Sequence, residues 1–204
     1  AYCEHVGVKR HEGGVKGDAE EFAKEQGLEM VEDNMYFATP KTMEWIEKLK
    51  QESKKNGTVG CVVLDKQGNL TAGTSTGGMF KKRWGRIGDS PVIGAGTYAD
   101  NNSCAVSCTG HGEYFIRHAV AFDVCARYKY LKESVEKAAD YIIHTELNTN
   151  AGNGGLIAVD KLGNIAMPYN SGGMFRGFLY KEKGSPEIKK GCGIGKKIVV
   201  VGEK

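Results

Sequence analysis

Two stretches of the chain alternate apolar and polar residues over short runs, which is the pattern of half-buried β-strands. Residues 59–80 read VGCVVLDKQGNLTAGTSTGGMF and residues 154–175 read GGLIAVDKLGNIAMPYNSGGMF, with 9 of the 22 aligned positions identical. Each stretch holds an apolar run, the sequence D-K-x-G-N and a second extended run. Because Asp and Asn bond nearby backbone groups and Gly adopts positive φ, each stretch predicts a β-hairpin.

Between the two hairpins the pattern changes from a strand to helices. Residues 103–109 predict a strand, and mixed three- and four-residue spacing of apolar positions predicts a buried helix over residues 113–128. A second helix is predicted over residues 134–147, where Ser134 is a suitable N-cap. The glycine-rich loop over residues 81–102 is long, and such a loop inside a compact domain is either disordered or functional.

The first part of the chain is predicted to be helical over residues 18–26 and 41–55, the latter introduced by Thr39 and Pro40. The element order is therefore two helices, a hairpin, a loop, a strand, two helices, a hairpin and a tail. Helices that occur in groups between antiparallel strands favour a layered α+β fold over a doubly wound parallel sheet. The length of 204 residues suits a single domain.

Composition and charge narrow the classes of partner. Glycine supplies 29 residues and proline only 4, and 23 of the glycines follow Thr58. A net charge of +3 is too small to indicate nucleic-acid binding. No apolar run approaches the roughly 18 residues of a membrane-spanning helix, and the first residues do not resemble a signal peptide. We therefore expect a cytoplasmic protein that binds neither nucleic acid nor membranes.

The six cysteines form no Cys-x-x-Cys pair and have no suitably spaced histidines, so the sequence predicts no metal site. Cys104 and Cys108 are four residues apart in the predicted strand and should share one of its faces. We interpret the cysteines as buried free thiols, which suit a reducing compartment. They are Cys3, Cys61, Cys104, Cys108, Cys125 and Cys192.

Candidate nucleophiles are few. The G-x-S-x-G sequence of α/β-hydrolases is absent, and His111, between two glycines, has no partner nucleophile. In Asn56-Gly57-Thr58 a threonine lies where a lysine-rich helix end meets the first strand, although N-G-T is also a common turn. A threonine hydroxyl becomes nucleophilic when a base lies beside it. Its own α-amine, with a pKa of roughly 7.7–8, is such a base once the bond after Gly57 is cleaved.

Five motifs in order connect this threonine to a known family. They are Gly57-Thr58-Val59-Gly60, Thr74-Ser75-Thr76-Gly77-Gly78, Gly85-Arg86-Ile87-Gly88-Asp89-Ser90-Pro91, Gly94-Ala95-Gly96-Thr97-Tyr98 and Thr109-Gly110-His111-Gly112-Glu113. With these motifs the chain resembles the plant-type asparaginases, also called isoaspartyl peptidases, from about residue 18 to residue 177. That family consists of N-terminal-nucleophile hydrolases. The related glycosylasparaginases share the chemistry but differ around the nucleophile, and they are the nearest alternative.

The resemblance implies roles for the threonines. Thr58 matches the nucleophile that is exposed when the Gly57–Thr58 bond is cleaved. Thr76 matches the second threonine, which hydrogen-bonds the nucleophile and supports its activation. Thr109 and the backbone N–H of Gly110 match the oxyanion hole, which stabilises the tetrahedral intermediate.

The resemblance also implies how the charged groups of a substrate are held. Arg86 matches the arginine that binds the α-carboxylate, Asp89 the acid that pairs with the α-ammonium, and Gly112 a backbone contact to that ammonium. Opposite charges three residues apart on one loop suit a zwitterionic aspartyl group. The alternative is a local surface ion pair, worth under about 1 kcal/mol. The resemblance implies no cofactor.

The implied fold is a four-layer αββα sandwich. Residues 1–57 would be the remnant of the α-segment and residues 58–204 the β-segment, together forming one domain. Family precursors have a longer α-segment, so the chain is expected to be N-terminally truncated, and residues 1–17 match nothing in the family. The implied activity is hydrolysis of L-asparagine and of β-aspartyl dipeptides by a dimer of αβ units. The alternative is an inactive truncated paralogue that acts as a binding protein.

Overall fold

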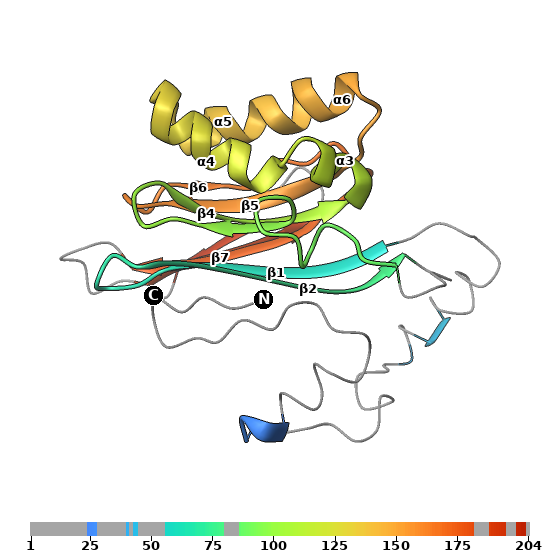
Figure 1. Ribbon diagram of the computed structural model, residues 1–204. Coiled ribbons are helices and arrows are strands. Elements are labelled where there is room, and N and C mark those ends of the chain that lie inside the picture. Colours follow the sequence, from blue (N-terminus) through green and yellow to red (C-terminus); the bar gives the residue numbers. More distant parts are fainter. Residues whose placement is uncertain are drawn as a thin grey trace.

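The computed structural model describes residues 24–27, 40, 43–44, 56–79, 86–181, 188–194 and 199–202. Within these ranges, helices cover one side of stacked antiparallel sheets, so the chain has the mixed α+β content that its pattern predicts (Figure 1). The helices predicted over residues 18–26 and 41–55 lie mostly outside the described residues. Of those two segments, residues 24, 25, 43 and 44 are described and helical.

The first predicted hairpin consists of β1 (Asn56–Leu64) and β2 (Leu70–Met79), which pair antiparallel. Asp65 closes the turn, because its Oδ1 accepts hydrogen bonds from the backbone N–H groups of Gln67 and Asn69, each at 2.8 Å. The side-chain amide of Asn69 donates to Asp65 Oδ2 at 2.9 Å. The local hydrogen bonds expected of the D-K-x-G-N sequence therefore build this turn.

The second predicted hairpin, β5 (Gly154–Asp160) and β6 (Ile165–Ala166), has the same turn. Asp160 Oδ1 accepts from the backbone N–H of Asn164 at 2.9 Å, and the Asn164 amide donates to Oδ2 at 2.8 Å. The glycine in each turn has positive φ, 87° in the first and 89° in the second. β6 is shorter than β2, because Pro168 follows and has no N–H to donate to a neighbouring strand.

A four-stranded sheet lies at the centre of the described structure, in the order β3 (Thr97–Ala99), β4 (Cys104–Gly110), β5 and β6. β4 confirms the strand predicted over residues 103–109. β3 lies inside the segment that the sequence predicts to be a loop. Its three residues pair with β4 across the short connection over residues 100–103, and a three-residue pattern does not reveal such a strand.

The two faces of β4 belong to two different hydrophobic cores. Cys104, Val106 and Cys108 are buried in the core beneath the helices, so the predicted shared face of the two cysteines is confirmed. On the opposite face, Ala105 packs with Leu70 in the core between the central sheet and the first hairpin. A strand that is buried on both faces carries an almost continuous apolar run.

Helices α3 (Gly112–Arg117) and α4 (Val120–Leu131) occupy the segment for which one helix is predicted. The prediction of a continuous helix is wrong, because Ala119 adopts a left-handed conformation with φ of 45°. This break directs two backbone N–H groups in the first turn of α4 to the carbonyls of Gly94 and Ala95, at 2.8 and 3.1 Å. A tertiary contact with the preceding loop therefore overrides the helical period.

The second predicted helix runs from α5 (Val135–Tyr141) through a π-helical turn, η3 (Ile142–Glu146), into α6 (Leu147–Thr149). The predicted N-cap is confirmed, because Ser134 Oγ accepts from the backbone N–H of Lys137 at 3.2 Å. The apolar face of this helix packs on the central sheet, with its alanines, valine and isoleucines fully buried.

The last described strands, β7 (Phe175–Lys181), β8 (Ile188–Ile194) and β9 (Val199–Gly202), form a three-stranded antiparallel sheet. The sequence predicts only a tail here, because Gly191 and Gly193 interrupt the alternation and glycine is uncommon in strands. Pairing along both edges of β8 stabilises the extended backbone despite those glycines.

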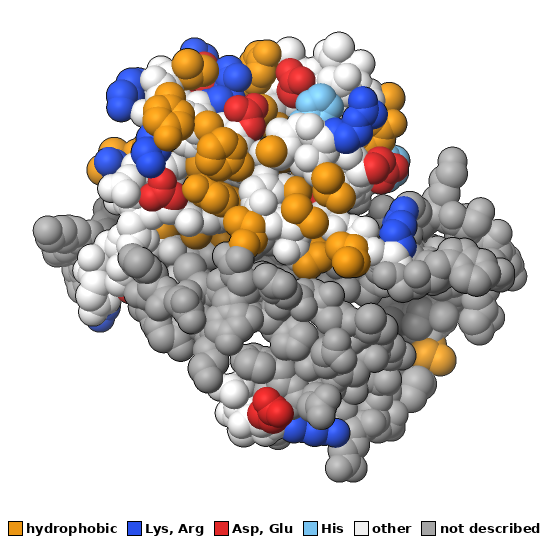
Figure 2. All heavy atoms as spheres, viewed as in Figure 1, with side chains coloured by type: hydrophobic (Ala, Val, Ile, Leu, Met, Phe, Trp, Pro, Cys, Tyr) orange, Lys and Arg blue, Asp and Glu red, His pale blue; other side chains and the backbone are white. Residues whose placement is uncertain are grey.

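Figure 1 shows the helices above the central sheet, and the first hairpin and β7 below it. The fourth layer of the predicted sandwich is not among the described elements. On the face shown in Figure 2, apolar and charged side chains mix over the helical layer. None of the described helices is long and apolar enough to cross a membrane.

Candidate active site

Thr58 lies near the start of β1, where the pairing with β2 is irregular between Gly57 and Thr58. Its hydroxyl donates to Thr76 Oγ1 at 3.2 Å. Thr76 in turn donates to the Gly57 carbonyl oxygen at 2.8 Å and accepts from the backbone N–H of Gly78 at 2.9 Å. A hydroxyl has one proton and two lone pairs. Thr76 therefore uses its full hydrogen-bonding capacity, and it connects the Thr58 hydroxyl to the Gly57 carbonyl.

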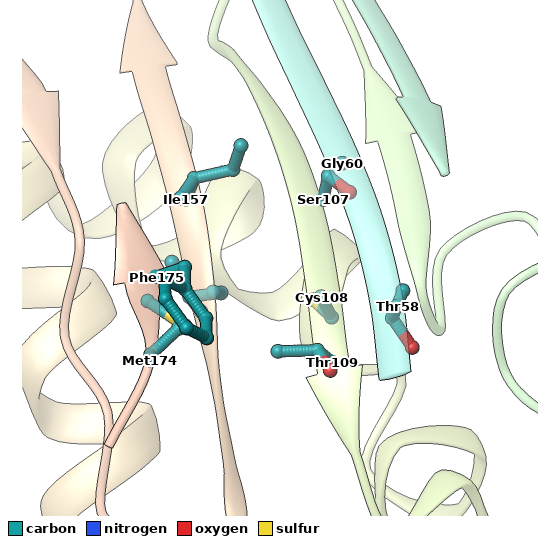
Figure 3. Close-up of a pocket in the computed structure, with 9 residues that line it drawn as sticks. Thr58, Gly60, Ser107, Cys108, Thr109, Ile157, Met174 and Phe175 are labelled. Carbon is teal, nitrogen blue, oxygen red and sulfur yellow. The ribbon is translucent and has the colours of Figure 1, made fainter. Parts of the chain in front are cut away.

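A cavity of about 60 Å³ opens beside Thr58 (Figure 3). This volume suits a few water molecules or one small polar group. Figure 3 shows Thr58 of β1 and Thr109 of β4 at the same end of the cavity, with Phe175 across from them. The lining residues are Thr58, Gly60, Ser107, Cys108, Thr109, Leu156, Ile157, Met174 and Phe175. The structure therefore brings together the predicted nucleophile and the predicted oxyanion threonine.

Glycines let the backbone approach this end of the sheets closely. A Cβ on Gly60 would overlap the hydroxyl of Ser107, so β1 lies directly against β4 beside the cavity. Gly110 has φ of +154°, and a Cβ there would lie 2.6 Å from the ring of Phe115. Only glycine fits such a position without strain. Gly110 follows Thr109 in β4, although it is not among the residues that line the cavity.

Asp89 is buried, with 7% of its surface exposed. Its carboxylate lies between two glycines: a Cβ on Gly96 would lie 2.8 Å from Oδ2, and one on Gly112 would lie 2.7 Å from Oδ1. Within the described part of the chain, Oδ2 has no hydrogen-bond partner. Burial, and secondarily the charge of Glu113, raises the pKa of Asp89. A buried carboxylate with an open oxygen is suited to binding a cationic group.

Arg86 lies apart from both the threonines beside the cavity and Asp89. Its side chain is exposed, and it is not among the residues that line the cavity. Among the described residues it forms no ion pair with Asp89, so the alternative of a local surface pair is not observed. The structure thus joins Thr58, Thr76 and Thr109 in one cluster and places Asp89 beside Gly112, while the Arg86 side chain is exposed.

Comparison with known proteins places the whole set of motifs in one family. A protein-family model described as asparaginase matches residues 8–188. This chain belongs to the asparaginase family. The match begins before the resemblance noted in the sequence, so the expectation that residues 1–17 match nothing is wrong for residues 8–17.

Relatives of this asparaginase-family chain carry names that agree with the motifs. The isoaspartyl peptidase of Salmonella typhimurium is 46% identical over 176 residues, covering 79% of this chain and 56% of that protein. The probable isoaspartyl peptidase/L-asparaginase 2 of Arabidopsis thaliana is 42% identical over 191 residues, covering 78% and 58%. The isoaspartyl peptidase/L-asparaginase of Mus musculus is 42% identical over 168 residues, covering 76% and 50%. The chain spans about half the length of the curated relatives it matches.

A chain of hydroxyl groups, which no sequence pattern indicated, connects the cavity of this asparaginase-family protein to the loop that carries Asp89. Ser107 Oγ lies 2.6 Å from Thr74 Oγ1, which lies 2.5 Å from Thr97 Oγ1. Thr97 Oγ1 is 3.0 Å from the carbonyl oxygen of Ser90. Each hydroxyl has one proton that rotates to suit its partners. Thr97 donates to Thr74, and Thr74 donates to the Gly96 carbonyl oxygen at 3.3 Å. In the Ser107–Thr74 contact either hydroxyl can be the donor.

The remaining candidates lie outside the cluster of Thr58, Thr76 and Thr109. His111 is the N-cap of α3, and its backbone N–H donates to the Asn153 carbonyl at 2.9 Å. The described residues contain no group of three or more side chains that could hold a metal ion. The prediction that the cysteines are buried is wrong for Cys61 and Cys192, which lie exposed on β1 and β8. Cys3 lies outside the described residues.

Proposed function

We propose that the chain is an amidohydrolase that uses Thr58 as its N-terminal nucleophile after cleavage of the Gly57–Thr58 bond. Its substrates are L-asparagine, which yields aspartate and ammonia, and β-aspartyl dipeptides. The observation that carries the proposal is the hydrogen-bonded path from the Thr58 hydroxyl through Thr76 to the Gly57 carbonyl, beside the cavity that Thr109 lines. The names of the relatives, isoaspartyl peptidase and isoaspartyl peptidase/L-asparaginase, support this substrate class.

The contacts of Thr76 suggest how the chain cleaves itself. Thr58 Oγ1 adds to the Gly57 carbonyl carbon while its proton passes to Thr76 Oγ1, 3.2 Å away. Thr76 passes its own proton to the Gly57 oxygen, 2.8 Å away, so the tetrahedral intermediate forms without net charge. The C–N bond then breaks as the hydroxyl proton of the intermediate passes to the nitrogen, leaving an ester on Thr58 and a free α-amine. Water hydrolyses the ester and releases Gly57 as a carboxylate.

In the mature site the free amine of Thr58 is the general base, with an unperturbed pKa of roughly 7.7–8. Thr58 Oγ1 attacks the β-carbonyl carbon of the substrate while the amine takes its proton. The Thr109 hydroxyl and the Gly110 N–H stabilise the oxyanion that forms. Ammonia or an amino acid leaves with the proton, and water then hydrolyses the β-aspartyl ester to release aspartate.

The charged groups of the substrate would be held away from the reacting carbonyl. The α-ammonium pairs with the open carboxylate of Asp89 and with the backbone of Gly112. That backbone is accessible because Gly112 has no side chain. The α-carboxylate binds the guanidinium of Arg86, whose planar fork matches it in two hydrogen bonds. Arg86 must turn inward from its exposed position to make that contact.

The four-layer αββα sandwich and the αβ dimer belong to the same proposal, as does the division into an α-segment at residues 1–57 and a β-segment at residues 58–204. The outer face of β1 supports the additional layer, because Val59 and Val63 on that face are 69% and 47% exposed. Exposed apolar side chains in a row on one strand are typical of a covered surface. N-terminal truncation and a cytoplasmic location stay predictions.

Mass spectrometry of the purified chain tests the proposal together with an assay of ammonia released from asparagine. We expect fragments 1–57 and 58–204, and activity that follows their appearance. Thr58→Ala should abolish both events, whereas Thr58→Ser keeps a hydroxyl and should retain slow cleavage. A chain that stays intact and releases no ammonia would instead support a non-catalytic binding role. Faster hydrolysis of glycan-linked asparagine than of β-aspartyl dipeptides would indicate a glycosylasparaginase.

A further inference from the structure

Two buried cysteines that the catalytic chemistry does not use face each other beneath the helices. Cys104 on β4 and Cys125 on α4 are 0% and 2% exposed. Their Sγ atoms lie 2.7 Å apart. Non-bonded carbon atoms, which are smaller than sulfur, already reach their optimum at roughly 3.5–4.0 Å. The two sulfurs therefore lie closer together than ordinary non-bonded packing brings such atoms. A short movement would bring them to the S–S bond length of roughly 2.05 Å.

The groups around the pair favour different roles for the two thiols. Ser103 Oγ lies 3.5 Å from Cys104 Sγ, and the Cys125 thiol donates to the Cys104 carbonyl at 3.2 Å. The hydrogen bond between the two thiols is the main reason that the pKa of Cys104 is lowered. The same contact, together with burial, raises the pKa of Cys125. Cys104 is therefore the better nucleophile and Cys125 the thiol that resolves its product.

We propose that Cys104 and Cys125 form a disulfide site, oxidised by exchange with a small-molecule disulfide such as glutathione disulfide. The Cys104 thiolate attacks one sulfur of that disulfide, breaks its S–S bond and releases one glutathione thiolate. Cys125 loses its proton and attacks the Cys104 sulfur of the mixed disulfide, releasing the second glutathione. Two protein thiols are oxidised, and one disulfide is reduced to two thiols.

The bond would close a loop that contains part of the proposed active site. The segment between Cys104 and Cys125 includes Thr109, Gly110 and Gly112, which the resemblance assigns to the oxyanion hole and to the substrate ammonium. A disulfide at the ends of this segment ties α4 to β4 and restricts the unfolded chain more than the folded one. The disulfide site itself rests on the thiol geometry alone and not on the proposed catalytic function.

Cys108 provides a matched control on the same strand. Its side chain is also buried beneath the helices, and burial raises the pKa of its thiol well above the usual range. Within the described residues, no hydrogen bond joins Cys108 Sγ to another sulfur, in contrast to the Cys104–Cys125 contact. Burial alone therefore predicts equal behaviour of Cys104 and Cys108, whereas the proposed site predicts different behaviour.

The test equilibrates the folded 204-residue chain with buffers of increasing glutathione disulfide to glutathione ratio. The reaction is followed to equilibrium, because a buried pair reacts only when the structure opens locally. Free thiols are alkylated after an acid quench, and peptide mass mapping locates the protected cysteines. We expect a cross-linked peptide that joins Cys104 to Cys125, with Cys108 alkylated throughout. The cross-linked form should melt about 5–10 °C higher than the reduced form.

Variants separate a specific site from random oxidation. Cys108→Ala should form the cross-link and show the Tm increase as the wild-type chain does. Cys125→Ala should form no cross-link, and glutathione should leave its Tm unchanged. The proposal would be overturned if Cys104 and Cys108 of the wild-type chain were alkylated to the same extent at every glutathione ratio. Cross-linking of Cys104 to Cys108 as readily as to Cys125 would overturn it as well, and neither outcome requires a variant that folds.

Discussion

Replacing Thr76 by valine removes one hydroxyl and keeps the shape of the side chain. In the folded chain this hydroxyl accepts from Thr58 at 3.2 Å, donates to the Gly57 carbonyl at 2.8 Å and accepts from the Gly78 N–H at 2.9 Å. Thr76 is exposed, so water can take over the lost hydrogen bonds. We therefore expect the free energy of unfolding to change by less than about 1 kcal/mol.

Cleavage between Gly57 and Thr58 should respond far more strongly to this change. The valine variant loses both the acceptor for the Thr58 proton and the donor that protonates the Gly57 carbonyl oxygen. Loss of one such donor costs roughly 10²–10³ in rate, or about 2.7–4 kcal/mol in the barrier. The assay is a time course of the intact mass of the purified chain, with urea unfolding followed by circular dichroism on an uncleaved sample.

Two control variants distinguish this effect from general damage to β2. Thr76→Ser keeps the hydroxyl and should cleave within about tenfold of the wild-type rate. Ser75→Ala removes a neighbouring exposed hydroxyl outside the path and should leave cleavage unchanged. Wild-type cleavage in Thr76→Val would refute the proton path. A loss of several kcal/mol of stability in that variant would show that the hydroxyl acts mainly on folding.

Three further predictions follow from Asp89 and its surroundings. Asp89→Asn should abolish activity on asparagine but raise the free energy of unfolding at pH 7, because burial raises the pKa of this carboxyl. The penalty of burying its charge appears only as pH rises from the unfolded pKa to the raised folded pKa, so urea unfolding at pH 3 should show no such gain. Gly112→Ala places a Cβ 2.7 Å from Asp89 Oδ1 and so blocks the position proposed for the substrate ammonium. Aspartate, the product, should therefore raise the Tm of the wild-type chain but not of this variant. Thr97→Val leaves the Ser90 carbonyl without its donor. The free energy of unfolding measured in urea should fall by about 1–3 kcal/mol, and KM for asparagine should rise. Thr97→Ser keeps the hydroxyl and should restore both values.

Features that depend on neighbouring residues in the chain were predictable. Both D-K-x-G-N turns form as expected, because each aspartate bonds backbone N–H groups only two and four residues away. The Ser134 cap likewise bonds a backbone group three residues further on. The five motifs identified the family because each is short and continuous, and the family match confirms them.

Features that depend on contacts between distant segments were not predictable from these patterns. The break at Ala119 exists because the first turn of α4 donates to the carbonyls of Gly94 and Ala95, far earlier in the chain. The three-stranded sheet at the end of the chain depends on pairing across glycine-rich segments.

For the candidate site, the sequence motifs predict which residues carry the chemistry, and the tertiary structure decided which of these residues meet. It joined Thr58 to Thr76 and Thr109, buried Asp89 between two glycines and left Arg86 exposed. It also aligned the hydroxyls of Ser107, Thr74 and Thr97 and brought Cys104 to Cys125, pairs that no local spacing indicates. The physical reason is range: turns and caps arise from bonds within a few residues, whereas burial and contact arise when separate strands and helices pack together.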